Sequence, residues 1–427
     1  MERERTRVEP TSRGTTSSAV RASLLVIAAT GSGSAANFLF QWFAARSFDR
    51  DDFSLFAALL AIVTLGVLPG PPAAIAIVRA LTDAGGSVFA VGLSAARRAI
   101  LSAGGAIIAV VALAVLLSGV PGFGAPLSAS GLFLCVLLTT LSWLVIYPDL
   151  ARVQADGDFR RYGGAHARLS LTRLGFGGIA LLLDAPVFVV VLAIAIGPWW
   201  VRSWLRHTPA AGPPLERPWL RTILPALAAT GGLHALVVID VIFARLHFAE
   251  SDPRAAGSYA AAATLSRILF HLPFAATAVT VQRTAAATAR GENPRSALWT
   301  NLALGGALVV VSGGILAAMP GLALRVFAGA DLDPGSEEWL RRLLIPMGLA
   351  SLAAVPAHYL LALGSRLPVV LLGIAPFVLA AWLSRAPADP GGLITPLTGT
   401  FATVGAVLLL GAIFHRGGTG AADAPDA

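Results

Sequence analysis

Ionisable side chains inside long apolar segments are the residues of this sequence most able to do chemistry. Arg267 and His271 lie four residues apart in one such segment, and so share a helical face, while His234 and Asp240 lie in the apolar segment before it. A charge at mid-membrane depth costs about 2.5–3.5 kcal/mol, so it normally faces a cavity or a partner. Arginine with histidine suits an anion such as a diphosphate, which a guanidinium binds through two hydrogen bonds.

Each of these residues also has a structural interpretation. Asp240 could be a counter-charge or a proton or sodium site for ion coupling, or it could pair with Arg267 and lock two helices together. A histidine on an apolar face, such as His234 or His271, often only hydrogen-bonds a carbonyl. The sequence leaves these alternatives open.

Further arginines lie at the ends of apolar segments. Arg46 and Arg245 are expected at the outer ends of two equivalent helices, and Arg79 and Arg283 at the inner ends of the next two. They could receive an anionic head group at either mouth of a cavity. The interpretation we favour is snorkelling, or capping of helix C-termini. Arg173, near the start of the fifth segment, is a candidate for the anion site or a simple membrane anchor.

Two other sets of residues bear on binding and motion. Asn37 and Gln41 share a face of the first segment, where they could bind sugar hydroxyls or the neighbouring helix. Proline must interrupt a helix, because it removes a backbone donor and clashes with the preceding turn. We therefore expect a break or hinge in the second segment and another in the eighth, at the prolines and the glycine that these segments contain: Pro69, Gly70, Pro71, Pro72 and Pro273.

The composition requires a membrane. Hydrophobic residues make up 56% and charged residues 13% of 427 residues, too little charge for a soluble surface. A membrane-spanning helix needs about 20 mostly apolar residues. The sequence predicts about twelve such helices, at roughly 21–47, 53–80, 98–120, 128–148, 165–183, 186–204, 222–248, 255–284, 296–319, 338–363, 367–384 and 391–414.

Arginines predict the orientation of these helices. They gather in alternate loops, whereas the intervening loops are acidic or uncharged, so both termini should be cytoplasmic. The net charge of +8 is therefore a matter of topology, and we exclude a nucleic-acid partner. The predicted organisation is a polar cytoplasmic tail (1–20), an N-lobe of six helices (21–204), a cytoplasmic linker (205–221), a C-lobe of six helices (222–415) and a disordered cytoplasmic tail (416–427).

The two predicted lobes resemble each other. Phe-Ala-Ala-Arg46 before an acidic turn corresponds to Phe-Ala-Arg245 before another, and Phe56 corresponds to Tyr259. Each pattern continues through proline to a basic residue 23 or 24 positions later. Both repeats would start on the inside. Two parallel lobes around a midplane cavity are a transporter design.

These residues resemble the multidrug/oligosaccharidyl-lipid/polysaccharide (MOP) exporter superfamily, and within it the polysaccharide-unit flippases. The likeness lies in Ala45-Arg46 through Phe56-Ala57, Ile239-Asp240-Val241-Ile242, the 154–161 loop and Val326-Phe-Ala-Gly, in that order over about 21–415. Ser54 departs from it, since the family usually has glycine there. The resemblance implies an all-α, MATE-like fold of two rocking six-helix bundles in the bacterial plasma membrane. It also implies a lipid-linked oligosaccharide as substrate, membrane lipids around it, and envelope glycosyltransferases or a polymerase as further partners.

Two other functions remain open. The same fold could serve a cation-coupled exporter of small molecules, although the span interiors offer essentially one carboxylate, Asp240. Asp49 and Asp51 form the Asp-x-Asp pattern of some membrane glycosyltransferases, or merely an acidic cap before a helix that begins near Phe53. We expect no enzyme activity, cofactor or metal site, because no nucleophile, nucleotide or metal-ligand motif occurs and Cys135 is the single cysteine.

Overall fold

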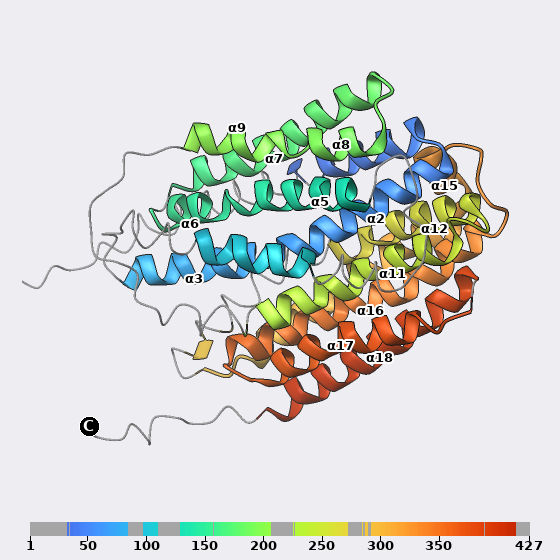
Figure 1. The fold of residues 1–427 in the computed structure, drawn as a ribbon. Coiled ribbons are helices and arrows are strands. Elements are labelled where there is room, and N and C mark those ends of the chain that lie inside the picture. The colour runs from blue at the N-terminus through green and yellow to red at the C-terminus, as the bar shows by residue number, and fades with distance from the viewer. Residues whose placement is uncertain are drawn as a thin grey trace, which may run out of the picture.

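The computed structural model describes residues 32–33, 35–83, 97–109, 129–156, 158–205, 225, 227–271, 284, 287–288, 292–387 and 389–415. All regular secondary structure in these residues is helical, as the apolar segments predict (Figure 1). Seven of the described helical segments are long and apolar enough to cross a membrane, and Leu367–Leu383 is a shorter apolar helix. The chain is a multi-pass membrane protein.

The helices run side by side along one direction (Figure 1). The N-terminal half (residues 35–205) contains helices at 35–47 and 97–109, α2 (Arg50–Val67), α3 (Gly70–Asp83), α5 (Ala129–Leu144), α6 (Tyr147–Ala155), α7 (Phe159–Leu182), α8 (Val187–Ala193) and α9 (Ile196–Leu205). The C-terminal half (residues 227–414) contains the π-helix η1 (Leu227–Gly231), α11 (Gly232–Phe248), α12 (Pro253–Ser266), α14 (Arg295–Ala318), α15 (Pro320–Ala328), α16 (Ser336–Ala362), α17 (Leu367–Leu383) and α18 (Pro390–Phe414).

Three spans of the N-terminal half are broken at a turn. The expected break in the second span lies at Leu68 and Pro69, between α2 and α3. Gly70 lies against the ring of Tyr147, where an added Cβ would come within 2.3 Å, so this break packs against the one between α5 and α6. At the break between α8 and α9, hydroxyls of α5 supply the missing donors: Thr139 donates to the carbonyl of Val191 at 3.2 Å, and Ser142 donates to that of Ala195.

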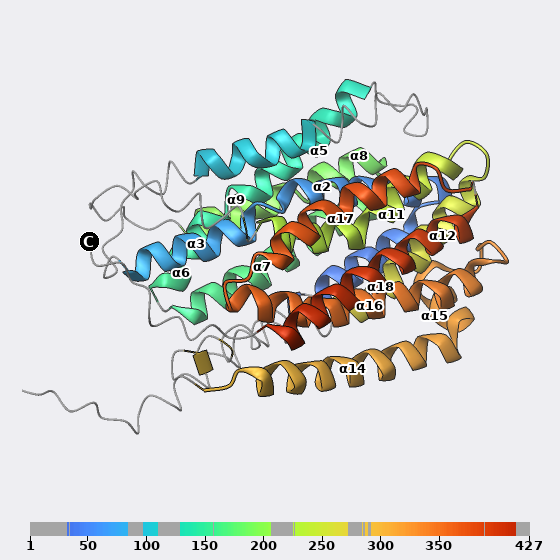
Figure 2. The ribbon, with the colours of Figure 1, turned by 90° about the horizontal axis from the view of Figure 1, so that it is seen from below.

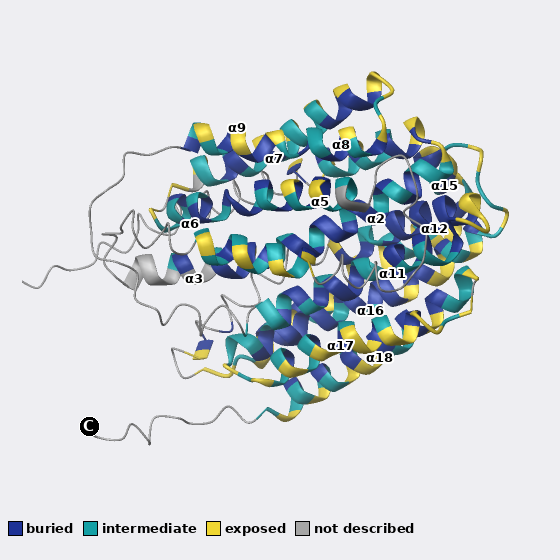
Figure 3. Cartoon of the chain, in the orientation of Figure 1, coloured by how far each residue is buried: buried dark blue, intermediate teal, exposed yellow. Residues whose placement is uncertain are grey.

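Burial separates the core from the lipid-facing surface (Figure 3). Every residue of α12 from Ala255 to Ser266 is buried, because α12 packs against α2 of the other half and against α16 of its own. By contrast, α14 lies at an edge of the bundle in Figure 2 and exposes large apolar side chains such as Val310 and Ile315. Apolar exposure of this kind is favourable only in lipid.

The two halves meet mainly through α2, which contacts both α11 and α12. Aromatic side chains fill the core next to this contact. Phe53 and Phe56 of α2 and Tyr259 of α12 are almost completely buried, and the ring of Phe53 meets the edge of Phe327 in α15 at 6.3 Å. The short helix α15 was not predicted, because its segment reads as part of an outer loop.

Candidate functional site

A buried ion pair occupies the interior of the C-terminal half. Arg267 follows the last residue of α12, and its Nη2 donates to Oδ1 of Asp240 on α11 at 2.7 Å. Its Nε donates to the carbonyl of Val237, 2.9 Å away, and the hydroxyl of Tyr259 donates to the other oxygen of Asp240 at 3.2 Å. The carboxylate is fully buried, whereas the arginine side chain is 13% exposed. Both oxygens of Asp240 therefore have protein partners.

Three histidines lie near one another, and one of them, His271, lies close to Arg267 of this pair. His234 Nδ1 lies 2.9 Å from the carbonyl of Thr230, and its ring meets the edge of Phe270 at 5.5 Å. His271 follows Phe270 and lies within electrostatic range of His234 and Arg267. The structure adds His358 of α16, which lies within range of His234 and 2.7 Å from the carbonyl of Ala354. His358 was not predicted, because the position of a histidine within an apolar segment does not reveal which helix it faces.

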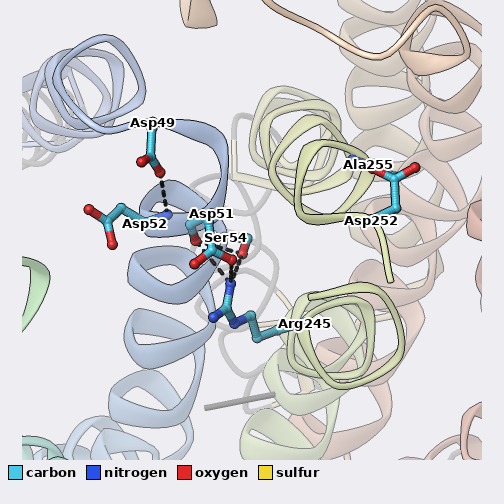
Figure 4. Close-up of polar contacts among 7 residues, drawn as sticks. All are labelled: Asp49, Asp51, Asp52, Ser54, Arg245, Asp252 and Ala255. Atoms are coloured by element: carbon cyan, nitrogen blue, oxygen red, sulfur yellow. Dashed lines mark hydrogen bonds and ion pairs between the residues drawn. The ribbon is translucent and has the colours of Figure 1, made fainter. Parts of the chain in front are cut away.

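At the end of the bundle that the arginine distribution predicts to be the outer one, Arg245 connects the two halves (Figure 4). Its Nη1 donates to the side chain of Asp51, to the carbonyl of Asp51 at 3.0 Å and to Oγ of Ser54 at 2.6 Å. The arginine is 5% exposed and Asp51 is 46% exposed. We name Arg245, Asp51 and Ser54 the outer latch. Ser54, the departure from the family pattern, is thus one of its acceptors.

Two further hydrogen bonds join the halves at the same end, and α15 accepts both. Arg50 Nη2 donates to the carbonyl of Ala328 at 2.5 Å, and Trp42 Nε1 donates to that of Val326 at 2.7 Å. Gly257 of α12 lies so close to Arg50 that an added Cβ would approach the Arg50 carbonyl oxygen to 2.1 Å. The outer ends of the two halves are closed against each other.

The structure corrects the start of the second helix. We expected it near Phe53 with Asp51 or Asp52 as the cap, but α2 begins at Arg50 and Asp49 is the cap, with its side chain accepting from the Asp52 amide at 2.8 Å. Asp252 caps α12 in the same way, accepting from the Ala255 amide at 2.9 Å (Figure 4). The matching caps support the internal repeat.

These roles leave little of the Asp-x-Asp pattern available for catalysis. Asp49 caps a helix and Asp51 belongs to the outer latch. Within the described parts of the chain, no group of three histidine, cysteine or acidic side chains could hold a metal ion.

Of the remaining predicted residues, those that the structure describes belong to neither of these clusters. Arg46 is exposed, with its guanidinium 5.6 Å from the ring centre of Trp42. Arg79 lies on α3, but its side chain is outside the described residues, as are Arg283 and Pro273. Gln41 is half-buried beside Phe40 on the first helix.

Arg173 lies deeper than its sequence position suggested. We expected the fifth span to start near residue 165, but α7 starts at Phe159, which places Arg173 about 21 Å along a helix of 24 residues. Its guanidinium lies 5.3 Å from the ring centre of Phe40 and 6.0 Å from that of Trp143. No hydrogen bond or ion pair joins it to another described residue, and its Nε is buried without a partner.

Comparison with known proteins identifies the fold. No family model and no curated protein matches the sequence. Among solved structures, the lipid II flippase MurJ in an inward closed conformation matches with a TM-score of 0.67 and 13% identity, covering 91% of this chain and 87% of that one. The eukaryotic MATE transporter AtDTX14 matches with a TM-score of 0.62 and 12% identity, covering 93% and 96%.

A MOP superfamily transporter from Pyrococcus furiosus, described as having a binding pocket of reverse polarity that suggests a different function, matches with a TM-score of 0.62 and 14% identity. It covers 92% of this chain and 94% of that one. At such identities the likeness establishes the fold alone: an all-helical, MATE-like architecture, as the sequence predicts.

Proposed function

We propose that this chain, which has the fold of MOP superfamily transporters, moves a lipid-linked oligosaccharide from the cytoplasmic to the outer leaflet of a bacterial plasma membrane. The substrate would be a polyprenyl diphosphate carrying sugars for cell-surface polysaccharide, with the diphosphate and sugars as its head group. Envelope glycosyltransferases or a polymerase would make and use it. The two-lobe division with cytoplasmic termini, predicted from the arginine distribution, belongs to this proposal.

The charge of the interior carries the proposal. Among the described acidic side chains only Asp240 is fully buried, and Arg267 neutralises it at 2.7 Å. Asp149, half-buried near the inner end, is shared by Arg97 and Arg202 at 3.0 and 3.2 Å. Arg173 adds a positive charge with no described carboxylate beside it. An interior in which the carboxylates are paired and one arginine is not has a positive net charge, which favours an anionic head group over a cationic drug.

The same observation weighs against a cation-coupled multidrug exporter. A cationic substrate or a coupling cation needs an available carboxylate, and both oxygens of Asp240 already accept hydrogen bonds. Of the structural neighbours, MurJ is described as a lipid II flippase and several others as MATE transporters, so the fold alone accommodates either cargo.

An anionic cargo has an energetic consequence. When the inside of the membrane is negative, moving negative charge outward is favourable by about 2.3 kcal/mol per charge per 100 mV. A head group with about two negative charges would therefore move outward without a coupling ion.

The test combines a deletion strain with purified protein. Deleting the gene should make a lipid-linked sugar accumulate on the cytoplasmic leaflet, and depolarising vesicles that contain the purified protein should slow flipping of that lipid. Unchanged leaflet distribution, together with drug hypersensitivity of the deletion strain, would instead support the exporter.

A further inference from the structure

Arg173 is the ionic group of the described interior that lacks a counter-charge. Arg267 pairs with Asp240, and Arg245 pairs with Asp51, each across a helix contact. Among the described residues, the groups recorded beside the Arg173 guanidinium are two aromatic rings, those of Phe40 and Trp143. A ring face attracts a cation but brings no negative charge, so the guanidinium keeps its full charge in a medium of low dielectric.

Close packing between the first helix and α7 fixes the position of this guanidinium. Near one end of the contact, a Cβ on Gly33 would lie 2.9 Å from Oγ of Ser170. One turn beyond Arg173, a Cβ on Gly177 would lie 2.4 Å from the ring of Phe40. The two helices therefore cannot approach more closely, and Phe40 is held against both Gly177 and Arg173.

Other polar atoms along this contact also lack partners. Besides Nε of Arg173, Oδ1 of Asn37 and Nε2 of His166 are buried without a hydrogen bond. Asn37 lies one turn from Phe40 on the same helix, and His166 lies two turns before Arg173 on α7. A buried polar atom without a partner costs about 1–3 kcal/mol, so three in one seam need an explanation.

We propose that this seam, formed by Asn37, Phe40, His166 and Arg173, is a sugar-phosphate subsite in the N-terminal half. The phosphate accepts hydrogen bonds from the Arg173 guanidinium and supplies the missing negative charge. A hydroxyl of the adjacent sugar donates to Oδ1 of Asn37, an acceptor that a phosphate alone cannot satisfy. His166 Nε2 completes the polar lining. This subsite deepens the proposed function and rests on it for the source of the phosphate.

The assignment places the anion away from the arginine that the sequence favoured. Arg267 already makes two hydrogen bonds within its own half, through Nε and Nη2, so binding a diphosphate there would compete with Asp240. Arg173 has no such competitor among the described residues. Arg173 is partly exposed as a residue, and of its guanidinium nitrogens Nε is the one that is fully buried without a partner.

Arginine labelling of the intact wild-type protein tests the subsite directly. The full chain, in lipid nanodiscs, is treated with phenylglyoxal with and without a polyprenyl diphosphate sugar, and modification of individual arginines is followed by mass spectrometry. A parallel arm uses inorganic pyrophosphate. Arg168 is the matched control, because it is an exposed arginine of the same helix that stacks on Trp204 at 3.9 Å. We expect the lipid to slow labelling of Arg173 and leave Arg168 unchanged.

Binding by variants gives the second measurement. Loss of a charge-assisted hydrogen bond should weaken binding of the lipid by about 10- to 100-fold in Arg173→Gln, with a smaller loss in Arg173→Lys, which keeps the charge but not the planar fork. Arg168→Gln should bind like the wild type. If pyrophosphate slows labelling of Arg173 and the lipid does not, the subsite binds phosphate, but the phosphate does not come from a lipid.

Two results would overturn the subsite: equal labelling of Arg173 with and without saturating amounts of either probe, or wild-type affinity in Arg173→Gln. These measurements distinguish failure of the subsite, which is read from binding, from failure of the proposed function, which is read from flipping. A protein that binds the lipid at Arg173 but does not flip it in vesicles keeps the subsite and loses the function. An Arg173→Gln variant that keeps wild-type affinity and flips as fast as the wild type loses the subsite and keeps the function.

Discussion

The Asp240–Arg267 pair offers the most informative perturbation of the interior. In Arg267→Gln, a carboxylate with no exposed surface keeps only the Tyr259 hydroxyl, 3.2 Å away, among its described partners. Removing one member of a buried pair typically costs about 3–5 kcal/mol, because the other charge is left without compensation. Asp240→Asn should cost less, about 1–3 kcal/mol, since Arg267 keeps the Val237 carbonyl and is 13% exposed.

The double variant Asp240→Asn/Arg267→Gln removes both charges at once. Two amides can hydrogen-bond each other, so the double variant should lose only about 1–2 kcal/mol and be more stable than Arg267→Gln alone. The four proteins form a double-mutant cycle, read as the free energy of unfolding in mixed micelles from tryptophan fluorescence. The control Arg168→Gln loses its contact with Trp204 and should change this free energy by about 1 kcal/mol or less.

Two outcomes would refute this reasoning. One is a loss below about 1 kcal/mol in Arg267→Gln, and the other is strict additivity across the cycle, since contacting charges normally couple by about 0.5–3 kcal/mol. The flipping rate of the double variant then shows whether the pair has a structural role or a role in transport. Wild-type rates would make it a lock between α11 and α12, whereas a stable but inactive double variant would give Arg267 a direct part in transport.

Three further predictions concern the outer ends of the helices. Arg245→Ala should increase the distance between spin labels on the outer ends of α2 and α11, because the outer latch is lost. The free energy of this contact should fall by about 1 kcal/mol or less, because Asp51 is 46% exposed. Gly257→Ala should separate α2 from α12 and slow transport, since its Cβ would overlap the Arg50 carbonyl, whereas Gly314→Ala, with no atom within 4 Å, should be neutral or stabilising in thermal melts. Asp49→Ala should lower the free energy of unfolding by about 1 kcal/mol, because the helix cap is lost, and flipping should continue. If the variant loses a sugar-transfer activity, the glycosyltransferase function is favoured.

Several features of the fold could be predicted from sequence because they depend on local physics. The lengths of apolar segments predict the spans, since lipid cannot satisfy backbone donors. Prolines predict the break between α2 and α3, because a proline lacks an N–H wherever it lies. The repeat predicts that both halves present an acidic turn before the second helix, and Asp49 and Asp252 cap corresponding helices.

The partners of the arginines were decided by tertiary structure. Sequence placed Arg245, Arg267 and Arg173 in apolar segments and offered an Asp240–Arg267 pair as one alternative, but it could not decide which of these arginines would meet a carboxylate. That depends on helix packing: α11 against α2 brings Arg245 to Asp51, and α12 against α11 brings Arg267 to Asp240. The packing of α7 brings Arg173 to the rings of Phe40 and Trp143. Apolarity is a property of each segment, whereas neutralisation of a charge requires a second residue from elsewhere in the chain.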